Sequence, residues 1–555
     1  TSRRQRQMCI RDRYQCPNCG GNIKFDIASQ KMACANCNSY FDPYDISKET
    51  DAEENTYFDV TEFTCPQCGG RILSTENTAA NFCSYCGAST ILSGRLTKEK
   101  RPGYIIPFKM TKQDCKEAYK KRVKNAIFAP KELKDPEFID GFRGIYMPYW
   151  VYHVTQKGMS GFRFSRSHRK GDYIYTDHYE LSGYNNSSYK GLSFDASSSF
   201  DDTLSQAIAP FDAKNMNTFT PSFLSGFYAD TADVPKNTYE YDAKSIAEDA
   251  SVDYIKNSVI PDSKEAHRYN LDDSDSQIAS HLDSHIEETD CAMFPVWFLS
   301  YRKKDRVAYA TINGQTGKIA ADLPVSIGKF ITGSLLLTIP IFLFLNIFFT
   351  FRPTTTLTLV AFIALISMIL YGIELKEIKK RDEGLDDIGK YAICNDNFDN
   401  KQPVKNKRKR SFKKVNNSKF FSIFTAFFIV FITFNVMSMT AALMSSLLLF
   451  NFGPIFWIAM IIIGIVLVRT HEKTLKTLKN KFVIPGSLPS LAAIIIAAVI
   501  SILKPVSDLF YYGGCIGAMI AVVFSLISLI NYYNMLATRK LPEFDNYNGG
   551  DDDAD

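Results

Sequence analysis

Four short stretches near the amino terminus carry the strongest structural signal in this sequence: Cys16-Pro-Asn-Cys19, Cys34-Ala-Asn-Cys37, Cys65-Pro-Gln-Cys68 and Cys83-Ser-Tyr-Cys86. Fourteen residues separate the two stretches of each pair, and the whole unit repeats after 49 residues. A Cys-x-x-Cys turn places two thiolates on one side of a tight knuckle, and two facing knuckles complete the tetrahedral sulfur shell that Zn2+ favours. We therefore predict two small zinc ribbons of β structure, at residues 14–42 and 63–92.

The predicted metal ligands are eight of the thirteen cysteines: Cys16, Cys19, Cys34, Cys37, Cys65, Cys68, Cys83 and Cys86. A disulfide framework is the competing interpretation, but paired Cys-x-x-Cys knuckles favour metal binding in a reducing compartment. Four thiolates fill the coordination sphere and leave no position open for a substrate. We therefore expect two structural Zn2+ ions per chain, each supplying much of the folding free energy of its ribbon.

No catalytic residue is predicted. Cys115, Cys291, Cys394 and Cys515 occur singly, and nothing in the sequence couples any of them to a base. The chain also has no GxxxxGK[ST] loop, the motif that cradles the phosphates of a nucleotide. We therefore expect a protein that is not an enzyme.

Composition and charge exclude several other classes. The chain has 555 residues, 46% of them hydrophobic, which excludes a disordered protein or a small disulfide-rich module. Residues 14–99 contain six Lys/Arg and eleven Asp/Glu, and each Zn(Cys)4 centre adds about −2 to their charge. Because Lys and Arg supply most non-specific affinity for phosphate, nucleic acid is not an expected partner of so acidic a pair of ribbons.

Residues 1–13 are set apart from the fold prediction. Their segment Met8-Cys9-Ile10-Arg11-Asp12-Arg13 resembles the translated end of a sequencing-library adapter, so we expect residues 1–13 to be non-native and the native start to be missing. A basic amino-terminal arm is the alternative. Without these residues the net charge falls from +5 to +1.

Residues 100–326 predict a cytoplasmic α+β domain. Helices are expected at 112–124 and 243–257, against a mainly antiparallel sheet. Two aromatic segments with Pro ahead of Trp, around Trp150 and Trp297, are typical of strands whose Trp anchors the core. His281 and His285 are predicted on a helix, where an exposed face is favoured over a metal-binding pair.

Six apolar runs follow, near 329–351, 355–374, 419–440, 445–468, 486–503 and 509–532. Each is close to the roughly 20 residues that cross a bilayer, so we predict an all-α transmembrane region of six helices. The helices would form three hairpins, 329–374, 419–468 and 486–532, with a basic cytoplasmic loop at 375–418 and an acidic cytoplasmic tail at 533–555.

The loops predict the orientation of these helices. Twenty-one Lys/Arg lie in the loops on one side and two on the other, which places both termini in the cytoplasm. The expected location is therefore a bacterial cytoplasmic membrane, crossed several times. Lipid-headgroup contacts are expected from five basic residues, because anionic lipids attract such clusters: Lys405, Lys407, Arg408, Lys409 and Arg410.

Several motifs together carry a family resemblance: the paired ribbons, Tyr104-Ile-Ile-Pro-Phe108, Pro148-Tyr-Trp150 and Asn313-Gly-Gln-Thr-Gly-Lys318. With these, the chain resembles uncharacterised bacterial membrane proteins that carry zinc ribbons of the transcription-factor-IIB type. Such proteins are often labelled primosomal replication-restart helicases, but ATP-driven unwinding needs the phosphate-binding loop that is missing here. The resemblance implies an architecture and a location, and no activity.

We interpret the chain as a non-enzymatic zinc-binding membrane adaptor or scaffold that presents its ribbons and α+β domain on the cytoplasmic face. Its expected partners are anionic membrane lipids and an unidentified protein, and homo-oligomer formation is left open. One alternative is a transporter or channel component regulated by the ribbons. A second is a membrane-tethered nucleic-acid binder.

Overall fold

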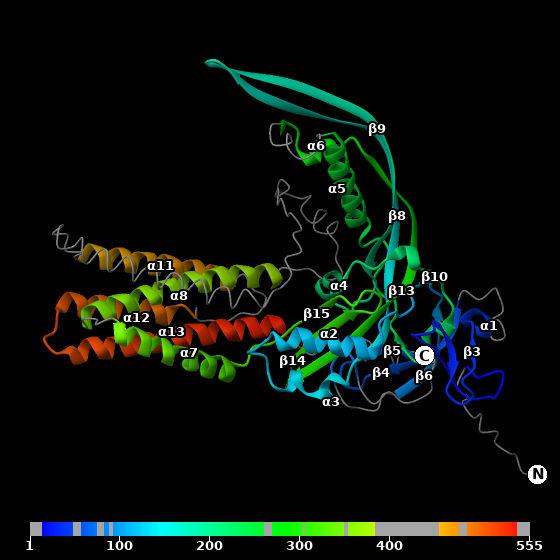
Figure 1. The fold of residues 1–555 in the computed structure, drawn as a ribbon, viewed down its shortest axis with the longest axis horizontal. Helices are drawn as coiled ribbons and strands as arrows, with labels where there is room; N and C mark the ends of the chain where they lie inside the picture. Colours follow the sequence, from blue (N-terminus) through cyan, green and yellow to red (C-terminus); the bar gives the residue numbers. More distant parts are fainter. Residues whose placement is uncertain are drawn as a thin grey trace, which may run out of the picture.

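The computed structural model describes residues 14–47, 57–74, 83–87, 93–259, 269–303, 306–348, 353–382, 454–476 and 486–540. Within these residues the chain forms a small sheet, a large sheet and eleven α-helices. Figure 1 shows the small sheet at one end of the molecule, the large sheet beside it, and the long carboxy-terminal helices at the other end. The first four-cysteine region and the apolar helices therefore lie at opposite ends of the molecule.

The small sheet belongs to the first ribbon. Strands β1 (Ile23–Asp26), β2 (Lys31–Cys34) and β3 (Tyr40–Phe41) pair antiparallel in that order, and helix α1 (Pro43–Ser47) follows. Ile23 and Phe25 are buried while Lys24 between them is exposed, the two-residue period of a strand with one covered face. Phe25 packs edge-on against Phe223 with ring centroids 5.2 Å apart, so the ribbon is attached to the larger domain.

The large sheet has thirteen strands of mixed direction, with the main order β10-β7-β13-β8-β11-β5-β4-β6. The pairs β7–β13 and β8–β11 are parallel, and the other pairs are antiparallel. Its strands are β4 (Tyr57–Thr64), β5 (Arg71–Ser74), β6 (Ser93–Lys100), β7 (Tyr104–Ile105), β8 (Arg143–Lys170), β9 (Tyr173–Asp195), β10 (Asn217–Thr218), β11 (Tyr228–Ala229), β12 (Tyr269–Leu271), β13 (Asp283–Lys303), β14 (Arg306–Asn313), β15 (Ile319–Ala321) and β16 (Arg539–Lys540). Strands β4, β5 and β6, which surround the second ribbon, are therefore part of this sheet.

Helices and 3-10 segments cover the sheet: α2 (Lys112–Lys124), η1 (Glu132–Lys134), α3 (Pro136–Ile139), α4 (Asp202–Ile208), η2 (Ala213–Asn215), η3 (Pro221–Leu224), α5 (Glu240–Val259) and α6 (Asp275–Ala279). Helix α2 has the predicted bounds, because Thr111 and Asp114 form a reciprocal capping box at its start. Its residues Cys115, Tyr119 and Val123 lie one turn apart and are all buried.

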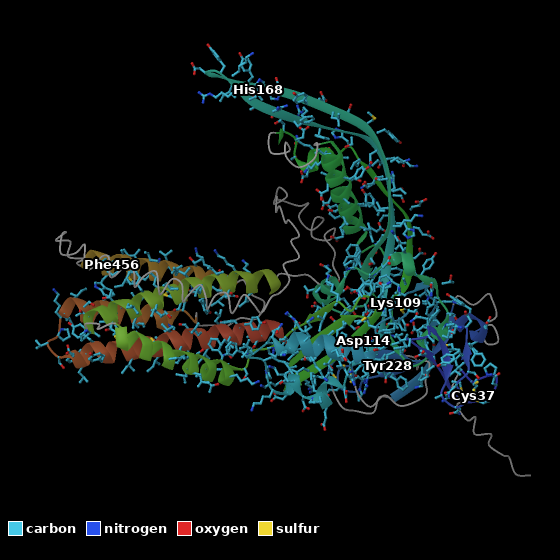
Figure 2. The ribbon with its side chains drawn as sticks, viewed as in Figure 1. Cys37, Lys109, Asp114, His168, Tyr228 and Phe456 are labelled. Carbon is cyan, nitrogen blue, oxygen red and sulfur yellow. The ribbon has the colours of Figure 1, made fainter. Side chains whose placement is uncertain are left out.

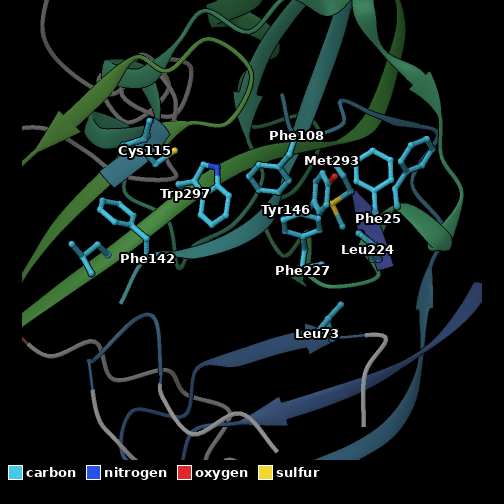
Figure 3. Close-up of a cluster of buried hydrophobic side chains, with 14 of the residues drawn as sticks. Phe25, Leu73, Phe108, Cys115, Phe142, Tyr146, Leu224, Phe227, Met293 and Trp297 are labelled. Carbon is cyan, nitrogen blue, oxygen red and sulfur yellow. The ribbon is translucent and has the colours of Figure 1, made fainter. Parts of the chain in front are cut away.

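Strands β8 and β13 form the centre of the sheet and carry both predicted Trp anchors. Trp297 is 5% exposed and its indole N–H donates to the Met110 carbonyl at 2.9 Å. Around it, Phe108 stacks on Phe227 and meets Trp297 and Tyr146 edge-on (Figure 3). Trp150 is only partly buried, and its indole donates to the Val234 carbonyl at 2.8 Å.

The helix predicted around His281 and His285 is wrong. His281 lies in the turn after α6, where its Nδ1 is 2.9 Å from the Gln277 carbonyl, and His285 lies in β13 opposite Thr155. Its imidazole contacts the Asp283 carboxylate at 2.9 Å. Pairing with β8 overrides the local helical pattern here, since the strand gains a full ladder of backbone hydrogen bonds.

Strands β8 and β9 extend well beyond the other strands as a two-stranded arm (Figure 1). Their pairing continues to Lys170 and Tyr173, and His168 lies close to the tip (Figure 2). Helices α5 and α6 support the part of the arm nearer the sheet, where Phe162, Val252 and Ile278 form a small buried cluster.

The prediction of a six-helix transmembrane region is wrong. Within the described residues, two helical stretches are long and apolar enough to cross a membrane, Thr356–Lys376 and Asp508–Met535. They belong to α8 (Pro353–Asp382) and α13 (Asp508–Ala537). The other described helices here are α7 (Ile327–Phe348), α11 (Pro454–Lys476) and α12 (Leu488–Leu503).

One of the remaining runs falls short for a physical reason. Helix α12 has 16 residues and ends at Leu503, where Lys504 adopts a left-handed conformation, so it is shorter than the roughly 20 residues of a span. The predicted runs at 329–351 and 445–468 are described only in part, as α7 and as the beginning of α11. The predicted span at 419–440 lies outside the described residues.

The end of α13 is fixed to the large sheet. Strand β16 pairs with β14 at Arg306 and Val307, and the Arg306 guanidinium donates to Thr538 Oγ1 at 2.7 Å and to the Met535 carbonyl. The Asn534 amide makes two hydrogen bonds with the backbone of Val325, just before α7 begins. The start of α7 and the end of α13 therefore lie together on the sheet side of the helices.

Candidate metal centres

The structure brings the eight predicted cysteines into two groups of four. In the first, Cys16 Sγ is 3.5 Å from Cys37 Sγ, and Cys19 Sγ is 3.5 Å from Cys34 Sγ. In the second, the corresponding distances are 3.7 Å for Cys65–Cys86 and 3.7 Å for Cys68–Cys83. Four sulfurs at about 2.3 Å from a tetrahedral Zn2+ lie about 3.8 Å apart. Both groups therefore fit a zinc ion, and all eight cysteines are free of disulfide bonds.

All four knuckles share one backbone turn. The residue after the second cysteine has a positive φ in each: Gly20 (70°), Asn38 (55°), Gly69 (73°) and Gly87 (69°). Its N–H donates to the carbonyl of the first cysteine at 2.8 to 2.9 Å. Glycine and asparagine tolerate this left-handed conformation, which explains their recurrence directly after the Cys-x-x-Cys motif.

The first group lies at the surface. Cys16 and Cys34 are buried, but Cys19 and Cys37 are exposed, and Figure 2 shows Cys37 at the end of the molecule opposite the long helices. Nearby, the Asn18 side chain donates to Ser39 Oγ at 3.0 Å, which links the two knuckles. Reagents in solution can therefore reach two of the four sulfurs.

The second group lies inside the protein. Its four cysteines are 0 to 4% exposed and pack with Phe63, Ile72 and Tyr85. Tyr85, between the two cysteines of the second knuckle, accepts a 2.5 Å hydrogen bond from the Tyr309 hydroxyl on its carbonyl. Its ring lies edge-on to Phe298, with centroids 6.4 Å apart. Strands β13 and β14 therefore hold this knuckle directly.

Two further contacts fix the same ribbon to β13. The Arg302 guanidinium donates to Gln67 Oε1 in the first knuckle at 2.7 Å. In the second knuckle, a side chain at Gly87 would come within 3.1 Å of Arg302 Cβ, so the backbone passes close to β13. Sequence reasoning missed these contacts, because residues more than 200 positions apart make them.

A buried carboxylate lies beside the second ribbon. Asp230 is 4% exposed; its Oδ2 accepts hydrogen bonds from Ser197 at 2.5 Å and from Ser199, and its Oδ1 accepts from the Thr231 N–H at 2.9 Å. Burial raises the pKa of this carboxyl group above its usual value, although these hydrogen bonds oppose the shift. Burial and the charge of Asp230 together raise the pKa of the Tyr85 hydroxyl.

One thiol in each group is prone to ionise in the absence of metal. A hydrogen bond with Ser39 lowers the pKa of Cys37 to about 6, and a hydrogen bond with Cys83 lowers the pKa of Cys65 to about 6. Because thiolates are the species that bind zinc, these two cysteines are ready ligands near neutral pH. The predicted lipid-contact residues Lys405, Lys407, Arg408, Lys409 and Arg410 lie outside the described residues.

The fold and its sites define a class: a protein with two four-cysteine metal groups, carried on a mixed sheet domain and followed by apolar helices. In sequence, the chain is similar to Uncharacterized protein YdjG of Bacillus subtilis (strain 168). The two are 27% identical over 341 residues, which cover 57% of this chain and 91% of that protein. No protein-family model and no solved structure matches the chain.

Proposed function

We propose that this protein is a membrane-anchored zinc adaptor, which uses its first ribbon to bind a protein partner and its second ribbon to hold the sheet domain together. The observation that carries the proposal is the difference in burial between the two groups. Ribbon 2 (residues 63–92) is enclosed by β13 and β14, whereas ribbon 1 (residues 14–42) presents two of its ligands to solvent. Both ions would be structural Zn2+, because four thiolates leave no open coordination position.

Ribbon 1 also offers an aromatic contact point. The Tyr40 side chain is 56% exposed on β3, three residues after the exposed Cys37. Exposed aromatic residues are typical anchors of protein interfaces. Residues 14–47 contain two Lys and three Asp, and the Zn(Cys)4 centre would add about −2 to their charge. The matching partner is therefore a protein with a basic surface, and the ribbon would be of the transcription-factor-IIB type that the sequence resembles.

Anchoring would come from α8 and α13. Lys376, Lys379, Lys380 and Arg381 lie at the end of α8, and Arg539 and Lys540 follow α13 on the sheet side. Positive residues favour the cytoplasmic side of a span, which would place the sheet domain and both ribbons in the cytoplasm of a bacterium. Reduced thiolates in that compartment are consistent with zinc binding.

Crosslinking mass spectrometry on the full chain in its native membrane, with zinc measured on the same sample, tests the proposal. We expect two zinc ions per chain and crosslinks from ribbon 1 to one reproducible protein. Tyr40→Ser should remove those crosslinks and leave the zinc content at two. Tyr254→Ser, at a 72% exposed tyrosine of α5, is the matched control and should change neither. Unaltered crosslinks in Tyr40→Ser would refute ribbon 1 as the contact surface.

A further inference from the structure

A third group of metal-ligand side chains lies on the large sheet, away from both ribbons. His153 on β8 and Glu288 on β13 are directly opposite each other, and Asp290 follows Glu288 by two residues on the same face. The register of β8 against β9 shifts at His153, and that of β13 against β8 shifts just before Glu288. Such bulges redirect side chains and are common beside functional sites.

The three side chains are close enough to share one ion. His153 Nδ1 is 3.8 Å from Glu288 Oε2, and one ligand atom from each of the three residues lies within 4.8 Å of the other two. Around a divalent cation with bonds of about 2.1 Å, neighbouring ligand atoms lie about 3 to 3.5 Å apart. Small rotations of the side chains, without movement of the strands, are enough to close this group around an ion.

The surroundings favour a bound cation. Asp290 Oδ2 is buried and has no hydrogen-bond partner. An unpaired buried carboxylate oxygen is unfavourable, and a cation would satisfy it. On the same face, Val151 lies opposite Asp290 and Ala292 follows it, both fully buried. Gly103, beside Asp290, contributes no side chain that could cover the carboxylate. The group therefore lies where an apolar face ends and solvent access begins, since the Glu288 side chain is 60% exposed.

We propose that His153, Glu288 and Asp290 form a third metal site, one that takes a divalent cation such as Mn2+ with one nitrogen and two carboxylate ligands. Imidazole and carboxylate ligands suit such ions, whereas the thiolate groups of the ribbons select zinc. Three protein ligands leave coordination positions open, in contrast to the closed sulfur shells. The bound ion would also join β8 to β13 near the base of the arm and so stabilise this pairing.

Mn2+ titration of the zinc-loaded full chain at constant pH, followed by electron paramagnetic resonance, tests this site. We expect one bound Mn2+ per chain with both zinc ions retained. Glu288→Gln replaces an exposed side chain and should leave the fold intact, and it should weaken Mn2+ binding by at least about tenfold. Asp290→Asn and His153→Ala should abolish the binding.

His168→Ala is the control, because His168 also lies on β8 and pairs with Asp177 at 3.5 Å, but near the tip of the arm. It should bind Mn2+ as the unaltered protein does. The zinc content of each variant, which should stay at two, shows that the protein has folded. Absence of Mn2+ binding in the unaltered protein, or equal binding in Glu288→Gln and the unaltered protein, would overturn the proposal.

Discussion

The two ribbons have the same cysteine spacing and the same knuckle turn, yet they occupy opposite environments. Ribbon 1 builds its own three-stranded sheet and leaves Cys19 and Cys37 exposed. Ribbon 2 is flanked by strands of the large sheet and has all four cysteines buried. A repeated local motif therefore acquires two roles from its surroundings, one as an accessible surface and one as part of a core.

The largest expected difference is in stability. Cys83→Ser removes a buried ligand of ribbon 2 and should lower the free energy of unfolding of the sheet domain by more than about 4 kcal/mol, since a metal and its enclosing contacts are lost together. Cys34→Ser, at a buried ligand of ribbon 1, should remove one zinc and destabilise the domain less, since two ligands of that ribbon are already exposed. Urea unfolding measures the stability of each variant, and zinc analysis measures its metal content. Equal destabilisation by the two variants would show that burial gives ribbon 2 no larger structural role than ribbon 1.

The ribbons should also differ in how fast they release metal. A chromogenic chelator should withdraw zinc in two phases, at rates that differ by more than about tenfold, because a barrier difference of 1.4 kcal/mol suffices for that ratio. The fast phase belongs to ribbon 1, whose Cys19 and Cys37 sulfurs are exposed. Cys19→Ser should remove the fast phase alone. A single release phase for both ions would mean that burial does not protect ribbon 2.

A smaller effect isolates one contact of ribbon 2. Tyr309→Phe removes the hydrogen bond to the Tyr85 carbonyl and should destabilise the protein by about 1 kcal/mol. It should accelerate the slow phase of zinc release and leave the fast phase unaltered. Tyr254→Phe, at an exposed tyrosine, is the control for loss of a hydroxyl group. Acceleration of the fast phase would mean that Tyr309 affects ribbon 1, which contradicts its assigned contact with ribbon 2.

The smallest effect is a pH dependence of the free energy of unfolding that arises at Asp230, beside ribbon 2. Burial raises the pKa of Asp230 in the folded protein, so its contribution to stability is full below the unfolded pKa and is lost as pH rises through the folded pKa. Asp230→Asn keeps one oxygen acceptor for the two serines but places an NH2 group against the Thr231 N–H. It should flatten this decline, by an amount on the order of 1 kcal/mol. Urea unfolding between pH 4 and pH 8 measures the slope, and an unchanged slope in the variant contradicts this role.

The sequence predicted those features that depend on short spacing. The Cys-x-x-Cys pairs identified both groups of four, and the helix expected at 112–124 has those bounds in α2. These features depend on residues that are close together in the sequence, so the local sequence determines their backbone geometry. The burial of ribbon 2 could not be predicted in the same way, because it arises from β13 and β14, far along the chain.

The errors have two origins. The helix expected around His285 is replaced by strand pairing with β8, more than 100 residues earlier. The six-helix prediction counted apolar residues, but span length depends on where a helix ends, as the left-handed Lys504 after α12 illustrates. His153 gave no signal at all, because its neighbours Glu288 and Asp290 join it only through that same strand pairing.

The junction between Arg306 and β16 has a consequence for biosynthesis. The ribosome makes the last strand of the sheet, Arg539–Lys540, only after α13 is complete, whereas its partner β14 emerges more than 200 residues earlier. At a translation rate of about 5 to 20 residues per second, the hydrogen-bond acceptors of the Arg306 guanidinium are synthesised roughly 10 to 50 s after Arg306 itself. The nascent sheet domain therefore keeps an unfinished edge throughout synthesis of the helices, and closure of that edge coincides with completion of the helical region.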